Sequence, residues 1–177
     1  MTTTASDPNR RHWEATAGDE ETDWGTLATE PEGIDEELLD DPAGLWLRPR
    51  GARAGAVVLA IHGGGFISGS AATHRRMFGH LARAAGIATF AVEYGLVPEH
   101  VFPSQIETVT NAYRRLLDGG ATSVSILGDS CGAALALGVA LADRARLRPG
   151  RAGVRVRRPQ IPDADRFLSR VRGVYLS

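Results

Sequence analysis

The residues with the clearest chemical potential form a Gly-x-Ser-x-Gly pattern, Gly128-Asp129-Ser130-Cys131-Gly132. The pattern lies between a segment that predicts a strand and one that predicts a helix. A tight strand-to-helix turn pushes a serine hydroxyl out of a sheet, and flanking glycines let the backbone pass closely. The helix N-terminus favours the negative charge that develops when a hydroxyl adds to an acyl carbon. Ser130 is therefore a candidate nucleophile. The pattern alone is weak evidence for a nucleophile, because in a chain with 21 glycines it can occur by chance and mark only an ordinary tight turn.

A second motif, His62-Gly63-Gly64-Gly65, directly follows another apolar run, and a histidine ahead of three glycines rarely arises by chance. Glycines allow backbone N–H groups to approach a developing oxyanion closely, where larger side chains would obstruct them. Both motifs come after a predicted strand and in the same order along the chain as in serine hydrolases with a nucleophile elbow. Together they predict acyl transfer.

The strands and helices around these motifs must position them, and the sequence predicts both kinds of element in alternation. Three apolar runs, at 56–61, 87–93 and 123–127, predict buried strands, and the segments 71–85, 104–118 and 133–144 predict helices. Ser104 and Glu107 have the spacing of a capping box for the second helix. Strands that alternate with helices indicate an α/β fold with a mostly parallel sheet and crossover helices.

Composition restricts the function further. With 177 residues, a net charge of −1 and 43% hydrophobic residues, the chain is expected to form one globular domain. All 20 basic residues are arginine, which excludes a phosphate loop ending in lysine and a pyridoxal Schiff base. The single cysteine excludes an internal disulfide and a Cys-rich zinc site. No apolar run is long enough for a membrane span or a leader, so we expect a cytoplasmic protein.

The two ends of the chain differ in charge. We expect four segments: an acidic arm at 1–32, the core at 33–145, an irregular segment rich in Arg and Pro at 146–170, and a terminal strand at 171–177. The basic segment lacks interleaved aromatic residues and any nucleic-acid-binding motif, so we expect no nucleic-acid partner.

The residues between about 33 and 142 resemble the hormone-sensitive-lipase-like esterases, also called the GDXG group, of the α/β-hydrolase fold. The resemblance rests on HGGGF at 62–66, Gly69-Ser70, Thr73-His74, EYGLVPEH at 93–100, Phe102-Pro103 and GDSCG at 128–132. It implies hydrolysis of small-molecule carboxylic esters with short to medium acyl chains, without a metal or an organic cofactor.

The resemblance also implies roles for single residues. Ser130 corresponds to the nucleophile, and the backbone N–H groups of Gly64, Gly65 and Cys131 to the oxyanion hole. Asp129 would orient the elbow, and His62 and Gly63 would brace the glycine loop, although His62 could also be an ordinary packed histidine. The loop at 94–100 would support the site. The acidic arm at 1–32 would form a lid over the acyl pocket, which Trp13 and Trp24 could line, although both indoles could equally lie in solvent. Cys131 stands where the family usually has alanine; a thiol nucleophile there has no base placed for it.

The catalytic acid and histidine are the missing parts. In this fold they follow the serine, whereas all five histidines precede Ser130, and no acid after it follows a later strand. We therefore expect a C-terminally truncated member with impaired hydrolysis and an exposed sheet edge through which chains self-associate. A catalytically inactive remnant or binding module of the same fold is the alternative, and a peptidase is a third interpretation.

Overall fold

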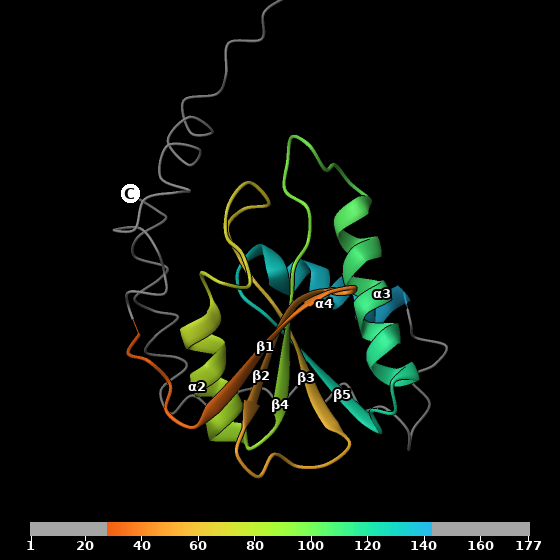
Figure 1. The fold of residues 1–177 in the computed structure, drawn as a ribbon. Helices are drawn as coiled ribbons and strands as arrows, with labels where there is room; N and C mark the ends of the chain where they lie inside the picture. Colours follow the sequence, from red (N-terminus) through yellow and green to blue (C-terminus); the bar gives the residue numbers. More distant parts are fainter. Residues whose placement is uncertain (1–27, 143–177) are drawn as a thin grey trace, which may run out of the picture.

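The computed structural model describes residues 28–142, which form a five-stranded sheet with three helices (Figure 1). The order of the strands across the sheet is β1-β2-β4-β3-β5. Their bounds are Ile34–Asp40 for β1, Ala43–Pro49 for β2, Ala56–Ile61 for β3, Ala88–Val92 for β4 and Ser123–Gly128 for β5. The three predicted strands of the core are thus present, each within one residue of its expected bounds.

Four of the five strands run in the same direction. Strand β3 pairs in parallel with both β4 and β5, whereas β2 is antiparallel to its neighbours β1 and β4. The predicted α/β sheet of mostly parallel strands is confirmed. The β1–β2 hairpin was not predicted, because β1 has the sequence IDEELLD and lies largely in solvent, so it lacks the apolar run of a buried strand.

The helices are α2 (Arg75–Ala85), α3 (Ser104–Asp118) and α4 (Cys131–Ala142). Helix α2 begins four residues later than expected, because residues 71–74 form a turn, and α4 begins directly after Ser130. The predicted capping box is wrong. The N-cap is Pro103, and the Ser104 hydroxyl donates backwards to the carbonyl of Val101 at 2.7 Å, so it caps no helical N–H.

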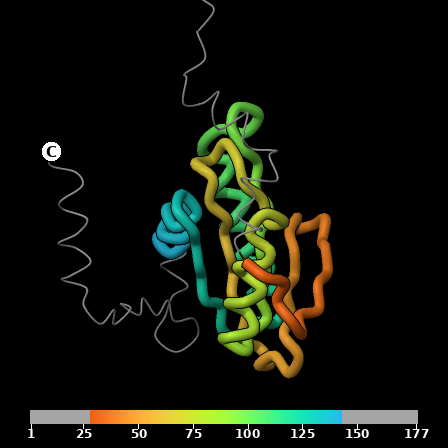
Figure 2. The backbone as a smooth tube through the Cα atoms, turned by 90° about the vertical axis from the view of Figure 1, so that its left-hand side faces the viewer, coloured from red at the N-terminus to blue at the C-terminus, as the bar shows by residue number. Residues whose placement is uncertain are grey.

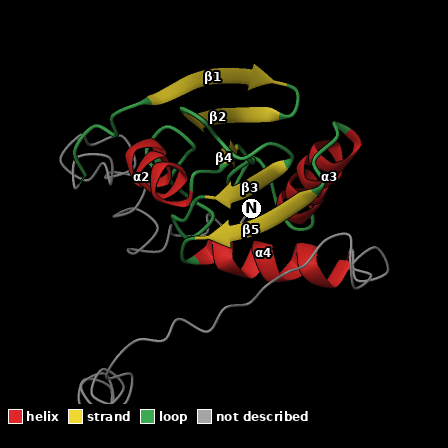
Figure 3. Cartoon of the chain, turned by 90° about the horizontal axis from the view of Figure 1, so that it is seen from below, coloured by secondary structure: helices red, strands yellow, loops and turns green. Residues whose placement is uncertain are grey.

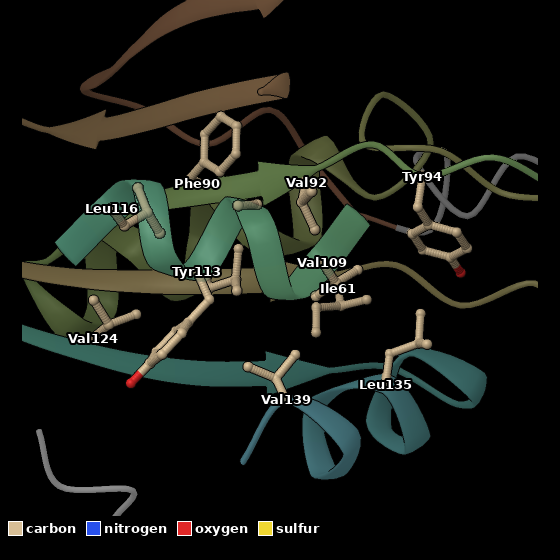
Figure 4. Packing of buried hydrophobic residues seen from close by; sticks show 12 residues of the cluster. Ile61, Phe90, Val92, Tyr94, Val109, Tyr113, Leu116, Val124, Leu135 and Val139 are labelled. Carbon is tan, nitrogen blue, oxygen red and sulfur yellow. The ribbon is translucent and has the colours of Figure 1, made fainter. Parts of the chain in front are cut away.

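The helices cover opposite faces of the sheet. Figure 1 shows α2 and α3 on either side of the sheet, and Figure 3 shows α4 next to β5; Figure 2 looks onto the face that α2 covers. Residues of α3 and α4 share one core, whereas those of α2 belong to the other. Alternation along the strands separates the two cores: Leu59 and Ile61 pack toward α3 and α4, whereas Ala60 between them packs toward α2. Figure 4 shows Tyr113 and Val109 of α3 in the larger core.

This topology determines where functional residues can lie. Strands β3, β4 and β5 are parallel neighbours, so their carboxyl ends share one edge of the sheet. The loops that follow these strands, at 62–74, 93–103 and 129–130, therefore leave the sheet together, at the top of Figure 1. Open α/β sheets bind their ligands at this edge. The predicted domain boundaries at 32 and 145 stay predictions, and the expected terminal strand at 171–177 lies outside the described residues.

Candidate active site

Ser130 occupies a strained turn between β5 and α4. Its φ of 47° is in the left-handed region, which a residue with a side chain adopts at a cost. The residue is exposed, so the hydroxyl is accessible. The turn is held against the neighbouring strand, because the N–H of Asp129 donates to the carbonyl of Ile61 at 3.0 Å.

Glycines allow the elbow and the glycine loop to lie in contact. A Cβ added to Gly63 would overlap the carboxylate of Asp129 and lie 3.2 Å from Cβ of Ser130. A Cβ added to Gly132 would overlap the carbonyl of Ile61 and lie 2.6 Å from that of His62. The two motifs singled out in the sequence are therefore brought together, although more than sixty residues separate them.

The glycine loop has a backbone that only glycine adopts easily. Gly64 and Gly65 have φ values of 115° and 63°. The carbonyl of Gly64 accepts hydrogen bonds from the N–H groups of Ile67 and Ser68 and from the Ser68 hydroxyl, at 3.0–3.2 Å. Within the described residues, the N–H groups of Gly64, Gly65 and Cys131, the first residue of α4, take part in none of the backbone hydrogen bonds of the turns and loops.

His62 is completely buried beneath this loop. Its Nδ1 donates to the Gly63 carbonyl at 2.9 Å, and its ring stacks on Tyr94 with 4.1 Å between the ring centroids. The Tyr94 hydroxyl donates to the carbonyl of His62 at 2.9 Å and lies 3.7 Å from Sγ of Cys131. Burial raises the pKa of Tyr94, which keeps its hydroxyl protonated. Tyr94 thus connects the two motifs.

Glu93 is a site residue to which the sequence analysis gave no role. One carboxylate oxygen accepts the N–H of Ala71 at 2.9 Å, and the other lies 3.4 Å from Nε2 of His62. Glu93 follows β4 directly, so the carboxyl edge of a predicted strand was the signal that could have found it.

His74 is the second residue that sequence reasoning missed as a functional group, although its Thr-His pair contributed to the resemblance. Its side chain is 2% exposed, and its Nε2 accepts the N–H of Gly63 at 3.3 Å while lying 3.4 Å from Oδ2 of Asp129. Burial lowers the pKa of His74 and outweighs the opposite effect of Asp129. No helix or strand lies between Gly63 and His74. The hydrophobic periodicity of the sequence could therefore not predict their contact.

The described residues do not supply a base to Ser130. No imidazole between 28 and 142 hydrogen-bonds its hydroxyl, and the acids that follow Ser130 in the sequence, Asp143, Asp163 and Asp165, lie outside that range. Two cavities, of about 390 and 460 Å³, do not include Ser130; the larger of the two is lined by Glu93, Ala71 and residues of the β1–β2 hairpin. The same residues contain no cluster of His, Cys, Asp or Glu suited to a metal ion, and no helix among them could cross a bilayer.

Comparison with known proteins agrees with this architecture. Residues 58–166 match the sequence model of the α/β hydrolase fold family. The chain is 40% identical over 94 residues to an acetyl-hydrolase of Streptomyces hygroscopicus, covering 52% of this chain and 31% of that protein. It is 33% identical over 124 residues to hormone-sensitive lipase of Mus musculus, covering 62% of this chain and 16% of the lipase.

Solved structures give the same result. The crystal structure of EstE5 soaked with p-nitrophenyl butyrate has a TM-score of 0.64 and 34% identity, covering 82% of this chain and 49% of that one. An esterase from the bacterial hormone-sensitive lipase family has a TM-score of 0.65 and 33% identity, and the match covers 84% of this chain and 49% of the esterase chain. The chain thus spans about a third of that acetyl-hydrolase and about half of these solved chains. It belongs to the hormone-sensitive-lipase-like esterases of the α/β-hydrolase family.

Proposed function

We propose that this chain is a carboxylic-ester hydrolase in which Ser130 is the nucleophile and the amides of Gly64, Gly65 and Cys131 form the oxyanion hole. The observation that carries the proposal is the contact between the two motifs, with Gly63 against Cβ of Ser130. The names of its relatives, which include esterases, acetyl-hydrolases and lipases, support the same reaction class.

The reaction follows from these positions. Oγ of Ser130 adds to the acyl carbon of a small-molecule ester while its proton passes to a base, and the carbonyl oxygen becomes an oxyanion. Three N–H donors at this oxygen stabilise it, and removal of one such donor typically costs about 10²–10³ in rate. The tetrahedral intermediate expels the alcohol, which takes up a proton, and water then releases the acid from the serine.

We expect the lack of a catalytic base for Ser130 to limit the rate of hydrolysis. A serine hydroxyl is a poor nucleophile near neutral pH until a histidine takes its proton. Without that histidine, the oxyanion hole and substrate binding still give a rate enhancement of about 10³–10⁴ over the reaction in water. We therefore propose that turnover by this 177-residue chain is low.

A fluorophosphonate probe tests the assignment. Because the serine lacks its activating histidine, we expect slow covalent labelling at Ser130 with excess probe, located by peptide mass spectrometry, and its loss in Ser130→Ala. Release of p-nitrophenol from p-nitrophenyl butyrate should fall in the same variant. A peptidase would instead favour a chromogenic peptide over the ester. No label on a chain with a folded circular-dichroism spectrum would contradict the proposal and favour the non-catalytic binding module.

We also propose that the chain self-associates through the sheet edge at β5. Among the described strands, β5 pairs only with β3, so one side of its backbone has no partner strand. The adjacent helix α4 exposes 64% of Leu137 and 70% of Leu141. Sedimentation velocity should show dimers or larger species, and the double variant Leu137→Glu, Leu141→Glu should contain fewer of them. A monomer at all concentrations would contradict this.

The cytoplasmic location stays a prediction.

A further inference from the structure

We propose that His74 is a positioning residue that fixes the glycine loop on the nucleophile elbow, acting as a neutral imidazole with its proton on Nδ1. Its importance for catalysis rests on the proposed function, because the amides that it would position belong to the proposed oxyanion hole. Its geometry stands independently of that function, on the contacts of His74 with Gly63, Thr73 and Asp129.

The hydroxyl of Thr73 determines which nitrogen carries the proton. Oγ1 of Thr73 accepts the N–H of Ser70 at 2.9 Å and donates its only proton to the Ser70 carbonyl at 3.0 Å. Nδ1 of His74 lies 3.0 Å from the same oxygen, which accepts from Nδ1 when the hydroxyl proton is directed to the Ser70 carbonyl. The proton of the neutral ring is therefore on Nδ1, and Nε2 has a free lone pair.

That lone pair faces the backbone of the glycine loop. Nε2 accepts the N–H of Gly63, while the carbonyl of Gly63 accepts Nδ1–H of His62 on its other side. Gly63 is thus held by two buried imidazoles, one on each polar group of its backbone. Because the next two residues are Gly64 and Gly65, the direction of their N–H groups depends on this anchor.

The same nitrogen also faces the elbow. Oδ2 of Asp129 lies 3.4 Å from Nε2, and no proton stands between these two atoms when the neutral ring carries its proton on Nδ1. A single nitrogen cannot accept from Gly63 and donate to Asp129 at once. Protonation of His74 would therefore release the Gly63 N–H and create an ion pair with Asp129.

The surroundings favour the neutral form. The His74 ring packs between the rings of His62, at 5.7 Å, and Phe78, at 5.5 Å, and is almost inaccessible to water. Asp129 is the acidic group that faces it, whereas the carboxylate of Glu93 faces His62 instead. Burial in this position lowers the pKa of His74 despite Asp129.

Nuclear magnetic resonance of the full chain tests this directly. In a uniformly ¹⁵N-labelled sample at pH 7.5, we expect Nε2 of His74 to have the shift of an unprotonated nitrogen and Nδ1 that of a protonated one. As the pH is lowered, the Gly63 amide should titrate with the same midpoint as His74 and lose protection against exchange. A proton on Nε2 at pH 7.5, or a Gly63 amide that does not follow His74, would overturn the proposal.

Two variants separate positioning from packing. In His74→Gln the side-chain amide reaches the place of Nε2 and offers a carbonyl to Gly63, whereas in His74→Asn it reaches only the place of Nδ1. Both remove the titration. We expect the Gln variant to keep the protection factor of Gly63 within about threefold, and the Asn variant to lower it about tenfold, as for the loss of one neutral hydrogen bond.

Equal protection of Gly63 in the two variants would contradict the proposal. If the Asn variant does not fold, the tautomer and the titration of the unmodified chain decide the question alone. Neither measurement needs turnover or labelling of Ser130. A chain that fails to react with a fluorophosphonate but has His74 protonated on Nδ1 would therefore refute the proposed function and leave this inference standing.

Discussion

Replacement of Gly132 by alanine should separate the elbow from the end of β3. The new Cβ would overlap the carbonyl oxygen of Ile61 and lie 2.6 Å from that of His62. Both are backbone atoms, and Ile61 is paired with β4 on one side and β5 on the other, so neither can turn away as a side chain would. The helix must shift by about half an ångström or more in a close-packed region.

The same substitution at Gly138, also in α4, is the matched control. There the new Cβ meets only the end of the Ile106 side chain, at 2.6 Å, which can change rotamer at a cost of about 0.5–1.5 kcal/mol. The gain in helix propensity of about 1 kcal/mol roughly offsets it. Gly132→Ala carries an overpacking cost of about 1–3 kcal/mol and, being near the helix N-terminus, gains less.

We therefore expect Gly132→Ala to be less stable than Gly138→Ala by about 2 kcal/mol. Urea unfolding followed by circular dichroism measures this difference, which corresponds to a midpoint lower by roughly 1 M for a slope of about 2 kcal/mol per molar. Equal midpoints for the two variants would refute the close contact between α4 and β3 on which the site depends.

Other substitutions test the strain, the oxyanion loop and the buried histidine. Ser130→Gly should abolish fluorophosphonate labelling yet raise stability by about 1 kcal/mol over Ser130→Ala in urea unfolding, because only glycine has no penalty at a φ of 47°; equal stability would argue against a strained elbow. Gly64→Ala should lower the labelling rate about 10²-fold or more, because its Cβ would overlap the Ser68 carbonyl at a φ of 115°, and an unchanged rate would exclude this loop from the site. The pKa of His74 is lowered by folding, so the unfolded chain binds the extra proton first. The contribution of neutral His74 to the free energy of unfolding should thus be fully present above pH 6.5. It should fall as the pH drops from 6.5 toward the lower pKa of His74 in the folded chain, and the fall should be smaller in His74→Gln. An equal loss of stability in both chains on acidification would contradict this.

The central strands could be predicted because burial on both faces leaves a clear pattern. Strand β3, AVVLAI, has no polar residue, and such a run fits a parallel strand between layers of helices. The β1–β2 hairpin could not be found this way. Its outer strand has four acidic residues in seven and is positioned by pairing with β2 rather than by its own burial.

The candidate site was predictable to the extent that its residues lie within local motifs. Ser130 and the glycines of the loop have a recognisable spacing next to a strand, and the parallel sheet then requires their proximity. Glu93 and His74 act through contacts across the fold, with His62 and with Gly63 and Asp129 respectively. Such contacts depend on the path of loops, which periodicity does not describe. The predicted capping role of Ser104 was wrong for a related reason, since the turn at Pro103 directs its hydroxyl toward Val101.

A crystal structure of the chain with Ser130 phosphonylated by excess fluorophosphonate tests the central claim most directly. Our account predicts that the phosphoryl oxygen lies about 2.7–3.1 Å from the backbone nitrogens of Gly64, Gly65 and Cys131. An adduct on Ser130 with this oxygen in solvent, and with the amides of the glycine loop directed elsewhere, would contradict it.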